Sequence, residues 1–282
     1  MTNDKKIINV KKIVEVKKEE LKLKIAKLKN NGINPKICVI VANKEESSRI
    51  YVNNKKKICE ELGILYEDYF LDENVSDNEI LGLIEKLNND ISVNAILLQL
   101  PLYEHLDERK IINKISYRKD VDGLTSINLG KLFVGEECII ACTPKGIITI
   151  LENVIQNFEG KHAVIIGRSN IVGKPIAQLL LNKNCTVTMC HSKTKDISKY
   201  TKEADILIVA TGIPRYITGD MVKKDSIIID VGINRVDGKV IGDVDTESVS
   251  NISKYVTKVP GGVGLTTVLS LVENVVEIAS KE

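Results

Sequence analysis

The chain of 282 residues contains no tryptophan, and aromatic residues make up only 4% of it. That scarcity argues against a surface on which the bases of single-stranded nucleic acid would stack. A formal net charge of +2 provides no bulk attraction for a polyanion. We therefore expect no nucleic-acid partner.

Metal-binding and disulfide patterns are missing too. The six cysteines include no C-x-x-C pair, and the three scattered histidines add no zinc-ligand spacing. We expect no bound metal. The simplest interpretation of the cysteines is that they are reduced thiols in a cytoplasmic protein.

Long apolar runs are also absent. The N-terminal segment MTNDKKIINVKKIVEVKKEE interrupts every short apolar run with charged residues, which is not typical of a signal peptide. No stretch approaches the roughly 20 apolar residues that cross a bilayer. The sequence therefore predicts no membrane partner.

What the sequence does contain is a regular alternation of extended and amphipathic segments. Strands are predicted at KICVIVA, ILYEDYFL, VNAILLQLPL, KHAVIIG, CTVTMC, DILIVATG and SIIIDVGIN, with helices between most of them. Residues 119–137 show no sustained period and are predicted to form a long connection, after which a helix starts at Pro144. This order implies βαβ units in two α/β domains with mainly parallel sheets, joined between about residues 120 and 145.

Three consecutive lysines begin at Lys55, inside a predicted helix. Tyr51, Lys55, Ile58 and Leu62 recur at the spacing of one core-facing stripe, whereas the next two lysines fall on other faces. A run of lysines is usually a solvated helix face. A lysine within an apolar stripe is costly to bury unless it is paired or used, so Lys55 is the candidate for chemistry.

Three other polar or loop-forming positions are candidates for the same pocket. Gln99 and Pro101 lie at the end of an apolar strand, and Asp122 lies in the DVDG stretch of the long connection. Each has a structural alternative as a strand-end amide, a loop proline or a turn aspartate. Since open α/β sheets bind ligands beyond the carboxyl ends of their strands, these residues and Lys55 could surround a small molecule.

The stretch VIIGRSNIVGKP runs from a strand through a glycine-bearing turn into a helix, which is where α/β sheets hold pyrophosphate. It differs from G-x-G-x-x-G because Ser169 replaces the middle glycine after Gly167, so a turn without a ligand is the alternative. The following strand ends in a His-Ser-Lys sequence containing Ser192, not in an acidic residue that would bind a ribose 2′-hydroxyl. Arg168 adds a positive charge that suits a 2′-phosphate. Together these features favour an NADP site.

Ten motifs occur in the order of a known family: YVNNKKKICEELGI, LLQLPL, KDVDGLTSINLGKL, CTPKG, GRSNIVGKP, CHSKT, ADILIVATG, IDVGIN, GDVD and VPGGVG. Over nearly its whole length the chain resembles the bifunctional methylenetetrahydrofolate dehydrogenase/methenyltetrahydrofolate cyclohydrolase family. The resemblance implies a folate-binding catalytic domain at residues 1–138 and a Rossmann-like NADP-binding domain at residues 139–282. It also implies an active-site cleft between them, and we expect the last helix, 266–282, to pack back on the first domain.

The activity implied by the resemblance is oxidation of 5,10-methylenetetrahydrofolate with NADP, then hydrolysis of the methenyl product to 10-formyltetrahydrofolate. Such one-carbon folate interconversion serves purine biosynthesis. Family members commonly form homodimers through the dinucleotide domain, so a homodimer is implied as well.

Roles for individual residues follow from the same resemblance. Lys55 would promote water attack and proton transfer, Gln99 would orient Lys55, and Tyr51 would pack on the aromatic ring of the substrate. Asp122 would accept hydrogen bonds from the pterin. The remaining substrate-binding positions would be Ser48, Pro101, Pro260, Gly261 and Gly262. Arg168 and Ser192 would hold the 2′-phosphate, and the cofactor path would be lined by Gly167, Ser169, Thr211, Gly212 and Ile233.

Other interpretations make different use of the same residues. The Tyr51-x-x-x-Lys55 spacing also occurs in short-chain dehydrogenases, but there the glycine-rich turn comes before the Tyr-Lys pair, and here it comes after. A dehydrogenase without cyclohydrolase activity, or a folate- or nucleotide-binding protein without catalysis, would not require Lys55, Gln99 and Asp122 to be intact.

Overall fold

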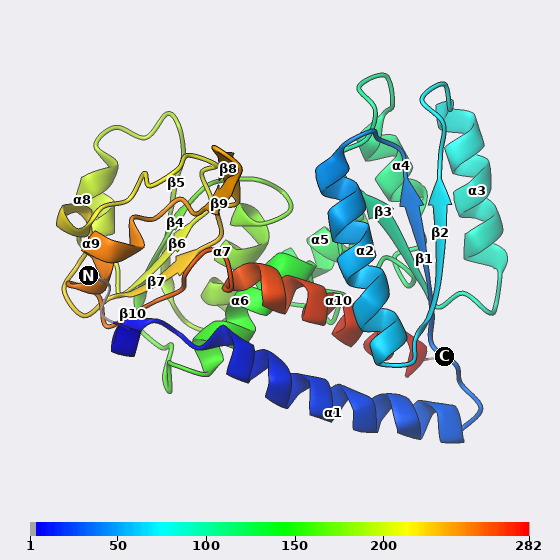
Figure 1. Ribbon diagram of the computed structural model, residues 1–282, viewed down its shortest axis with the longest axis horizontal. Helices are drawn as coiled ribbons and strands as arrows, with labels where there is room; N and C mark the ends of the chain where they lie inside the picture. Colours follow the sequence, from blue (N-terminus) through cyan, green and yellow to red (C-terminus); the bar gives the residue numbers. More distant parts are fainter. Residues whose placement is uncertain (1–3, 282) are drawn as a thin grey trace. The chain divides into compact units, whose positions relative to one another are not determined.

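A computed structural model describes residues 4–281 as two compact units, both of them α/β (Figure 1). The three-stranded unit comprises Val16–Cys142 and the C-terminal residues from Val268, and the five-stranded unit comprises Thr143–Thr267 and the N-terminal residues through Glu15. Within both sheets every strand pair is parallel. The predicted fold class, two α/β domains with mainly parallel sheets, is confirmed.

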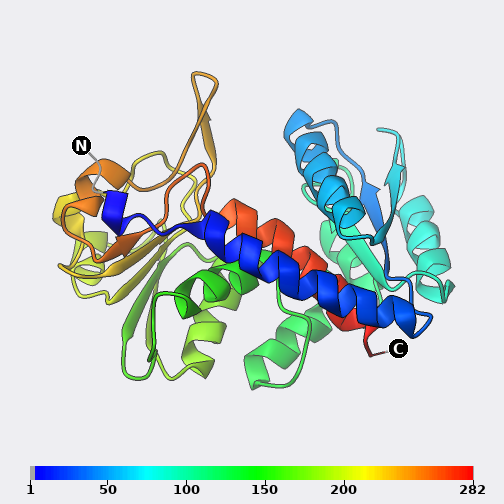
Figure 2. The same cartoon turned by 60° about the horizontal axis from the view of Figure 1, so that its bottom comes forward.

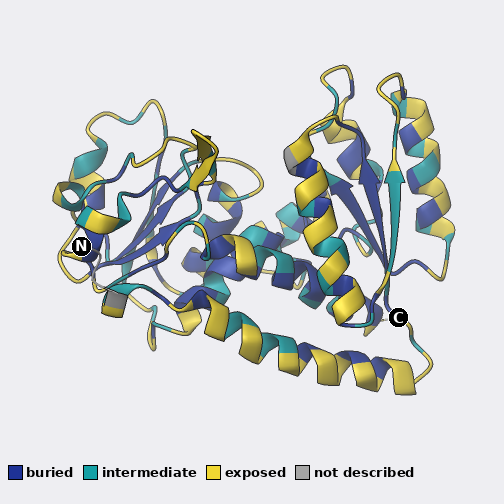
Figure 3. Cartoon of the chain, viewed as in Figure 1, coloured by how far each residue is buried: buried dark blue, intermediate teal, exposed yellow. Residues whose placement is uncertain are grey.

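The three-stranded unit has strand order β2-β1-β3. Its elements are α1 (Val10–Asn30, which begins in the other unit), β1 (Lys36–Val41), α2 (Glu46–Glu61), β2 (Leu65–Phe70), α3 (Asp77–Asn89), β3 (Ala95–Gln99), α4 (Glu108–Lys114) and α5 (Ser126–Val134). The central strand β1 is buried from its second residue onward, which explains its continuous apolar run (Figure 3). Helices α3 and α4 cover one face of the sheet, where Ile80 and Ile111 pack with Cys38 and Ile96.

The prediction that residues 119–137 form an irregular connection is wrong, because α5 occupies the middle of that segment. Thr125 caps the helix by accepting a hydrogen bond from the Asn128 N–H at 3.3 Å. Gly135, with φ of 78°, ends it in the left-handed conformation that glycine favours. These two capping residues set the ends of a short helix that buries Asn128 and Leu132.

The face that α2 buries is also shifted from the predicted stripe. The buried positions are Ser48, Val52, Cys59 and Leu62, whereas Tyr51, Lys55 and Ile58 are half-buried. Lys55 thus lies at the margin of the buried face. Such a position suits a lysine, because a long aliphatic stem can pack while its ammonium group reaches a polar partner.

The five-stranded unit has strand order β10-β7-β6-β4-β5. Its elements are α6 (Cys142–Glu152), β4 (His162–Ile166), α7 (Gly173–Asn182), β5 (Thr186–Cys190), α8 (Ile197–Thr201), β6 (Ile206–Val209), β7 (Ile227–Asp230), β8 (Asn234–Val236), β9 (Lys239–Ile241), α9 (Thr246–Ser250), β10 (Tyr255–Val256) and the start of α10 (Val263–Ala279). The helix predicted to start at Pro144 begins at Cys142. Alternate residues of the strands enter separate cores on the two faces, with Ile165 and Ile208 in one and Val164 and Leu207 in the other.

The N-terminal segment joins the five-stranded unit at its edge. Ile7 forms a parallel bridge with Val256, and the Ile8 N–H donates to the Val256 carbonyl at 3.0 Å. The segment therefore extends the sheet beyond β10, whereas the sequence predicts that residues 1–138 form a single domain.

Strands β8 and β9 form an antiparallel hairpin that projects from the five-stranded unit (Figure 2). Its Val236 and Val240 are each 37% exposed. Across residues 4–281, no helix is both long enough and apolar enough to cross a membrane.

Candidate active site

Lys55 and Gln99 are brought together at the carboxyl end of β3. The Lys55 Nζ donates to Gln99 Oε1 at 2.9 Å, and Gln99 Nε2 donates to the Leu100 carbonyl at 2.8 Å. The second hydrogen bond fixes the amide so that its oxygen faces the lysine. Because an ammonium group has three donors, Lys55 keeps donors for a ligand after this contact.

The neighbouring strand ends complete the local scaffold. β1 is the central strand, with β2 on one side of it and β3 on the other. The strand order therefore reverses between β1 and β3, and the crevice at the carboxyl ends of these two strands is the switch point of the sheet. Asn43, just after β1, donates from Nδ2 to the Pro101 carbonyl at 2.7 Å. Pro101 lines a hollow of ≈ 380 Å³ that also includes Asn43 and Tyr103.

The backbone on both sides of Asp122 is held by buried polar side chains. Asp120, 3% exposed, accepts from the Thr125 N–H at 2.8 Å and from Asn128 Nδ2 at 2.9 Å. Burial raises the pKa of Asp120, and these hydrogen bonds oppose the rise. Asp122 itself is half-buried.

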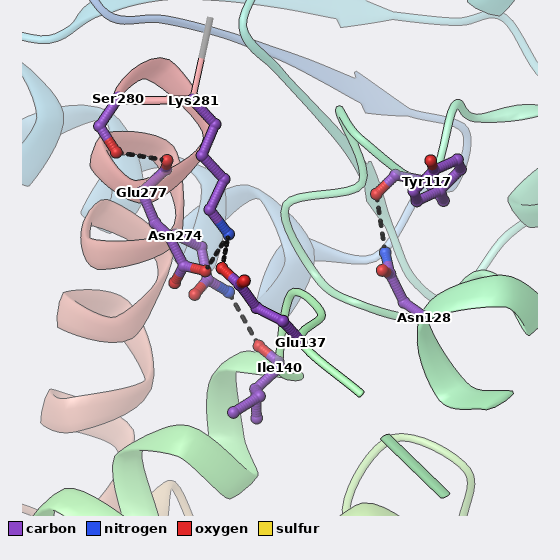
Figure 4. A network of polar contacts seen from close by, with 8 residues as sticks. All are labelled: Tyr117, Asn128, Glu137, Ile140, Asn274, Glu277, Ser280 and Lys281. Atoms are coloured by element: carbon purple, nitrogen blue, oxygen red, sulfur yellow. Dashed lines mark hydrogen bonds and ion pairs between the residues drawn. The ribbon is translucent and has the colours of Figure 1, made fainter. Parts of the chain in front are cut away.

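Asn274 of α10 holds the same segment from a second side. Its Nδ2 donates to the carbonyls of Val121 and Ile140, each at 2.8 Å. Figure 4 shows Asn274 directed at Ile140, with Asn128 directed at the Tyr117 carbonyl nearby. The segment before and after Asp122 is thus anchored to α5 and α10, and neither anchor was predicted from the sequence.

The other predicted substrate-binding residues belong to both units. Ser48 is buried on α2 and Tyr51 is half-buried one turn along. Pro260, after a cis peptide bond, is exposed, and Gly261 has φ of 99°. Gly262 has no room for a side chain, because a Cβ there would lie 2.5 Å from the Lys258 carbonyl oxygen. Gly261 also lines a hollow of ≈ 350 Å³ with Asn9 and Lys258.

In the five-stranded unit, the predicted cofactor residues lie at the carboxyl ends of adjacent strands. Gly167 follows β4, and its N–H donates to the Cys190 carbonyl at the end of β5 at 2.9 Å. That bond brings the loop of Arg168 beside the loop of Ser192, and both side chains are exposed. A Cβ on Gly167 would lie 2.4 Å from the Ala210 carbonyl oxygen, so only glycine fits this turn.

The turn leads into α7, whose first N–H groups point toward Ser169. The Ser169 Oγ accepts from the N–H groups of Val172 at 3.2 Å and Gly173 at 3.3 Å. A Cβ on Gly173 would meet the Gly167 carbonyl oxygen at 2.2 Å, so the turn and the helix pack without side chains between them. The strand-turn-helix geometry, with Arg168 exposed, fits a phosphorylated dinucleotide.

Thr211, Gly212 and Ile233 follow the next two strands, β6 and β7. Thr211 is half-buried, and Gly212 and Ile233 are exposed. Behind them lie two fully buried carboxylates, Asp230 and Asp243, whose role was not predicted from the sequence. The motifs IDVGIN and GDVD, which contain them, were the available signal.

Comparison with known proteins identifies a family for both units. The model of the tetrahydrofolate dehydrogenase/cyclohydrolase catalytic domain matches residues 8–122, and that of the corresponding NAD(P)-binding domain matches residues 141–282. The chain belongs to the tetrahydrofolate dehydrogenase/cyclohydrolase family. This confirms the predicted resemblance, the Rossmann-like domain and the enzyme class of methylenetetrahydrofolate dehydrogenase and methenyltetrahydrofolate cyclohydrolase.

Relatives match along nearly the entire chain. The bifunctional protein FolD of Clostridium novyi is 47% identical over 272 residues, covering 96% of this chain and 98% of the relative. That of Halalkalibacterium halodurans is 45% identical over 275 residues, covering 98% and 99%.

Solved structures agree with the fold. The bifunctional enzyme FolD from Campylobacter jejuni has a TM-score of 0.96 at 48% identity, covering 98% of each chain. The FolD enzyme from Trypanosoma brucei, described as complexed with NADP cofactor and inhibitor, has a TM-score of 0.93 at 30% identity, covering 98% of this chain and 97% of its own.

Proposed function

We propose that the protein oxidises 5,10-methylenetetrahydrofolate to the 5,10-methenyl form with NADP and then hydrolyses that product to 10-formyltetrahydrofolate. The single observation that supports this most directly is the 2.9 Å hydrogen bond from Lys55 to Gln99, beside the switch point of the three-stranded sheet. A dehydrogenase alone has no need for an oriented lysine at this point, because its chemical step releases no proton to the protein.

In the dehydrogenase step, a C–H bond of the methylene bridge breaks and its electron pair leaves with the hydrogen. NADP supplies the hydride acceptor. What remains is the methenyl cation, and the protein contributes the orientation of the substrate. We assign that task to Asp122, which would accept from the pterin amino and ring N–H groups, and to Tyr51, which would pack on the aromatic ring.

In the cyclohydrolase step, water adds to the methenyl carbon and loses a proton. The bond from that carbon to N5 then breaks as N5 gains a proton and the new hydroxyl loses its own proton to become the formyl carbonyl, so the reaction releases one proton overall. Lys55 would move these protons as the general acid–base group beside the substrate. Gln99 would hold Lys55 in place through the observed hydrogen bond. Ser48 and Pro101 would complete the folate site within the three-stranded unit, and a role of Pro260, Gly261 and Gly262 in folate binding stays a prediction.

The cofactor is NADP rather than NAD in this proposal. Arg168 and Ser192 stand on adjacent loops at one sheet edge, and no acidic residue ends β5. An arginine and a hydroxyl suit a 2′-phosphate, and the FolD structure from Trypanosoma brucei is described with NADP. Gly167, Ser169, Thr211, Gly212 and Ile233 would line the rest of the cofactor path.

The assignment of folate binding to residues 1–138 and NADP binding to residues 139–282 stays a prediction, as does a cytoplasmic homodimer. All six cysteines are free thiols, which suits a reducing compartment. Val236 and Val240 on the projecting hairpin offer an exposed apolar surface for a second copy. Light scattering coupled to gel filtration would measure the mass in solution.

One assay tests the proposed function. Purified protein is mixed with methylenetetrahydrofolate and NADP, and the formation of NADPH is followed together with the appearance and decay of the methenyl product. We expect NADPH to form and the methenyl species to decay faster than it does in buffer alone. NADPH formation without faster decay would leave only the dehydrogenase, and no NADPH would contradict the proposal.

A further inference from the structure

A single carboxylate joins two of the loops that form the proposed cofactor site. Asp243 Oδ2 accepts from the Thr211 N–H at 2.6 Å, the Thr211 hydroxyl at 2.9 Å and the Gly212 N–H at 2.9 Å. Its Oδ1 accepts from Asn234 Nδ2 at 2.8 Å. The loop after β6 and the strand that begins next to Ile233 are thereby tied to one fully buried side chain.

A second carboxylate holds the backbone of the first. Asp230 Oδ1 accepts from the N–H groups of Asp243 and Gly232, each at 2.9 Å, and its Oδ2 accepts from the Val244 N–H at 3.0 Å. Asp230 is 0% exposed and is the last residue of β7. Among residues 4–281, neither carboxylate has a cationic partner, so the polar donors of these loops alone solvate both groups.

The space around the two carboxylates is closed by glycines. A Cβ on Gly232 would lie 2.1 Å from Asp243 Oδ1, and a Cβ on Gly242 would lie 1.9 Å from Asp230 Oδ2. A side chain at Gly232 or Gly242 would collide with these carboxylates, so both positions require glycine. The geometry of these loops therefore depends on the acceptors in the two side chains.

We infer that Asp243 is a positioning residue for the dinucleotide, which fixes Thr211, Gly212 and the start of β8 in the conformation that binds NADP, and that Asp230 holds Asp243 in place. This inference rests on the proposed cofactor site. Asp243 is buried beneath the loops, so it acts through Thr211 and Gly212 and does not touch the dinucleotide.

The chain offers a matched control in Asp205, which lies at the opposite end of the same sheet, just before β6. Its carboxylate accepts from the His162 N–H at 2.9 Å and pairs with Lys223 at 2.6 Å. Asp205→Asn weakens a loop contact in the same unit, at the amino ends of the strands and away from the proposed cofactor site at their carboxyl ends. It should leave the affinity for NADP unchanged.

The experiment compares Asp243→Asn and Asp205→Asn with the wild type by titration of NADPH fluorescence and by the kinetics of both reactions. In Asp243→Asn an amide N–H₂ faces donors that need an acceptor. We expect the Kd and KM for the dinucleotide to rise about 10- to 100-fold. The kcat at saturating NADP and the cyclohydrolase activity should stay near wild type, because Lys55 and Gln99 belong to the other unit.

The outcomes separate this inference from the proposed function. A wild type that fails to bind NADPH contradicts the cofactor site itself. If the wild type binds and Asp243→Asn binds equally well, Asp243 is not a positioning residue. An equal loss in Asp205→Asn, or a parallel fall of cyclohydrolase activity in Asp243→Asn, also overturns the inference, because either result indicates general destabilisation.

Should Asp243→Asn fail to fold, Asn234→Ala decides the question. Asn234 is half-buried, and alanine there removes the bond from β8 to Asp243 Oδ1 at 2.8 Å together with a longer one to the Ile241 carbonyl at 3.2 Å. We expect a rise in the KM for NADP of about 3- to 10-fold with unchanged cyclohydrolase activity. An unchanged KM in this folded variant would overturn the inference.

Discussion

Lys55 Nζ lies 2.9 Å from Gln99 Oε1, and the Gln99 amide is itself held by the carbonyl of the next residue. The amide presents an acceptor to the lysine and cannot offer the lysine a proton. This arrangement fixes the direction of the Lys55 side chain through a neutral acceptor and not through a carboxylate.

The first prediction separates Lys55 from the two lysines that follow it. Lys55→Met should lower cyclohydrolase turnover about 10²- to 10⁴-fold, the usual contribution of general acid–base catalysis. Dehydrogenase activity should survive in part, because hydride transfer needs no proton acceptor from the protein. Methenyltetrahydrofolate should therefore accumulate, which its absorbance would report.

Lys56→Met and Lys57→Met are the matched controls. Lys56 lies 3.5 Å from Asp68 on the β2 side, and Lys57 is exposed. Surface pairs of this kind contribute about 0–1 kcal/mol, so both variants should behave as the wild type. Loss of cyclohydrolase activity in either control, with Lys55→Met active, would show that the assigned helix face is wrong.

Asp122→Asn should weaken folate binding in both reactions. The asparagine keeps the size of the side chain but replaces one acceptor with a donor that faces donors on the pterin. Such a mismatch costs about 1–3 kcal/mol, so the KM for the folate substrate should rise about 5- to 100-fold in both assays. NADPH binding, measured by fluorescence, should not change. An unaltered folate KM would rule out the pterin-anchoring role.

The strands were predictable because their signal is local. Buried parallel strands appear as continuous apolar runs, and β1, β3, β4 and β7 all have that character. Helix α5 was hard to predict from periodicity, because Ile127, Phe133 and Val134 are 52%, 73% and 66% exposed, while the polar Asn128 is buried beside Leu132. Its capping residue and the buried Asp120 beside it determine the helix, and the importance of Asp120 is visible only in three dimensions.

The site residues also divide into those that a local sequence pattern reveals and those that only the three-dimensional structure reveals. Lys55 could be singled out from helix spacing, although the buried face proved to be centred on Val52 and Cys59. The roles of Asp243 and Asn274 could not be found in this way. Asp243 meets Thr211 across 32 positions of the sequence, and Asn274 meets Val121 across 153. No local pattern records contacts between residues so far apart.

Arg168→Ala tests the choice of cofactor. An arginine–phosphate contact contributes about 1.5–3 kcal/mol, so the KM for NADP should rise by about one to two decades. NAD lacks the 2′-phosphate, so its KM should barely change. Steady-state kinetics with each cofactor provides the comparison, and equal losses with both would argue that Arg168 does not recognise the phosphate.

Asn274→Leu tests the anchor of the Asp122 segment. Two carbonyls, of Val121 and Ile140, would lose the amide that donates to both at 2.8 Å. The free energy of unfolding should fall by about 1–3 kcal/mol, measured by urea denaturation. Ser280→Ala, just beyond the end of the same helix, is the control, because its exposed hydroxyl can be replaced by water (Figure 4). Equal stability of the two variants would contradict the anchoring role.

The last prediction concerns the pH dependence of stability through Asp230. Burial raises the pKa of Asp230 to about 6, against an ordinary value near 3.8, although three backbone N–H groups oppose the rise. The folded state therefore holds this proton more tightly than the unfolded state. The resulting stabilisation is complete below about pH 4 and is lost as the pH rises through about 6.

Urea denaturation of the wild type and of Asp230→Asn at half-unit steps of pH isolates this group. The wild type should lose stability relative to the variant by about 1.4 kcal/mol per pH unit between about pH 4 and 6, and the difference should be constant above that range. Asp205→Asn is the control: burial alone would raise the pKa of Asp205, but hydrogen bonds from Lys223 and His162 lower it. Stability from Asp205 is lost only as the pH falls below its ordinary pKa, so its difference from wild type should be nearly flat between pH 4 and 6. A flat difference for Asp230→Asn as well would mean that Asp230 ionises equally in the folded and unfolded chains.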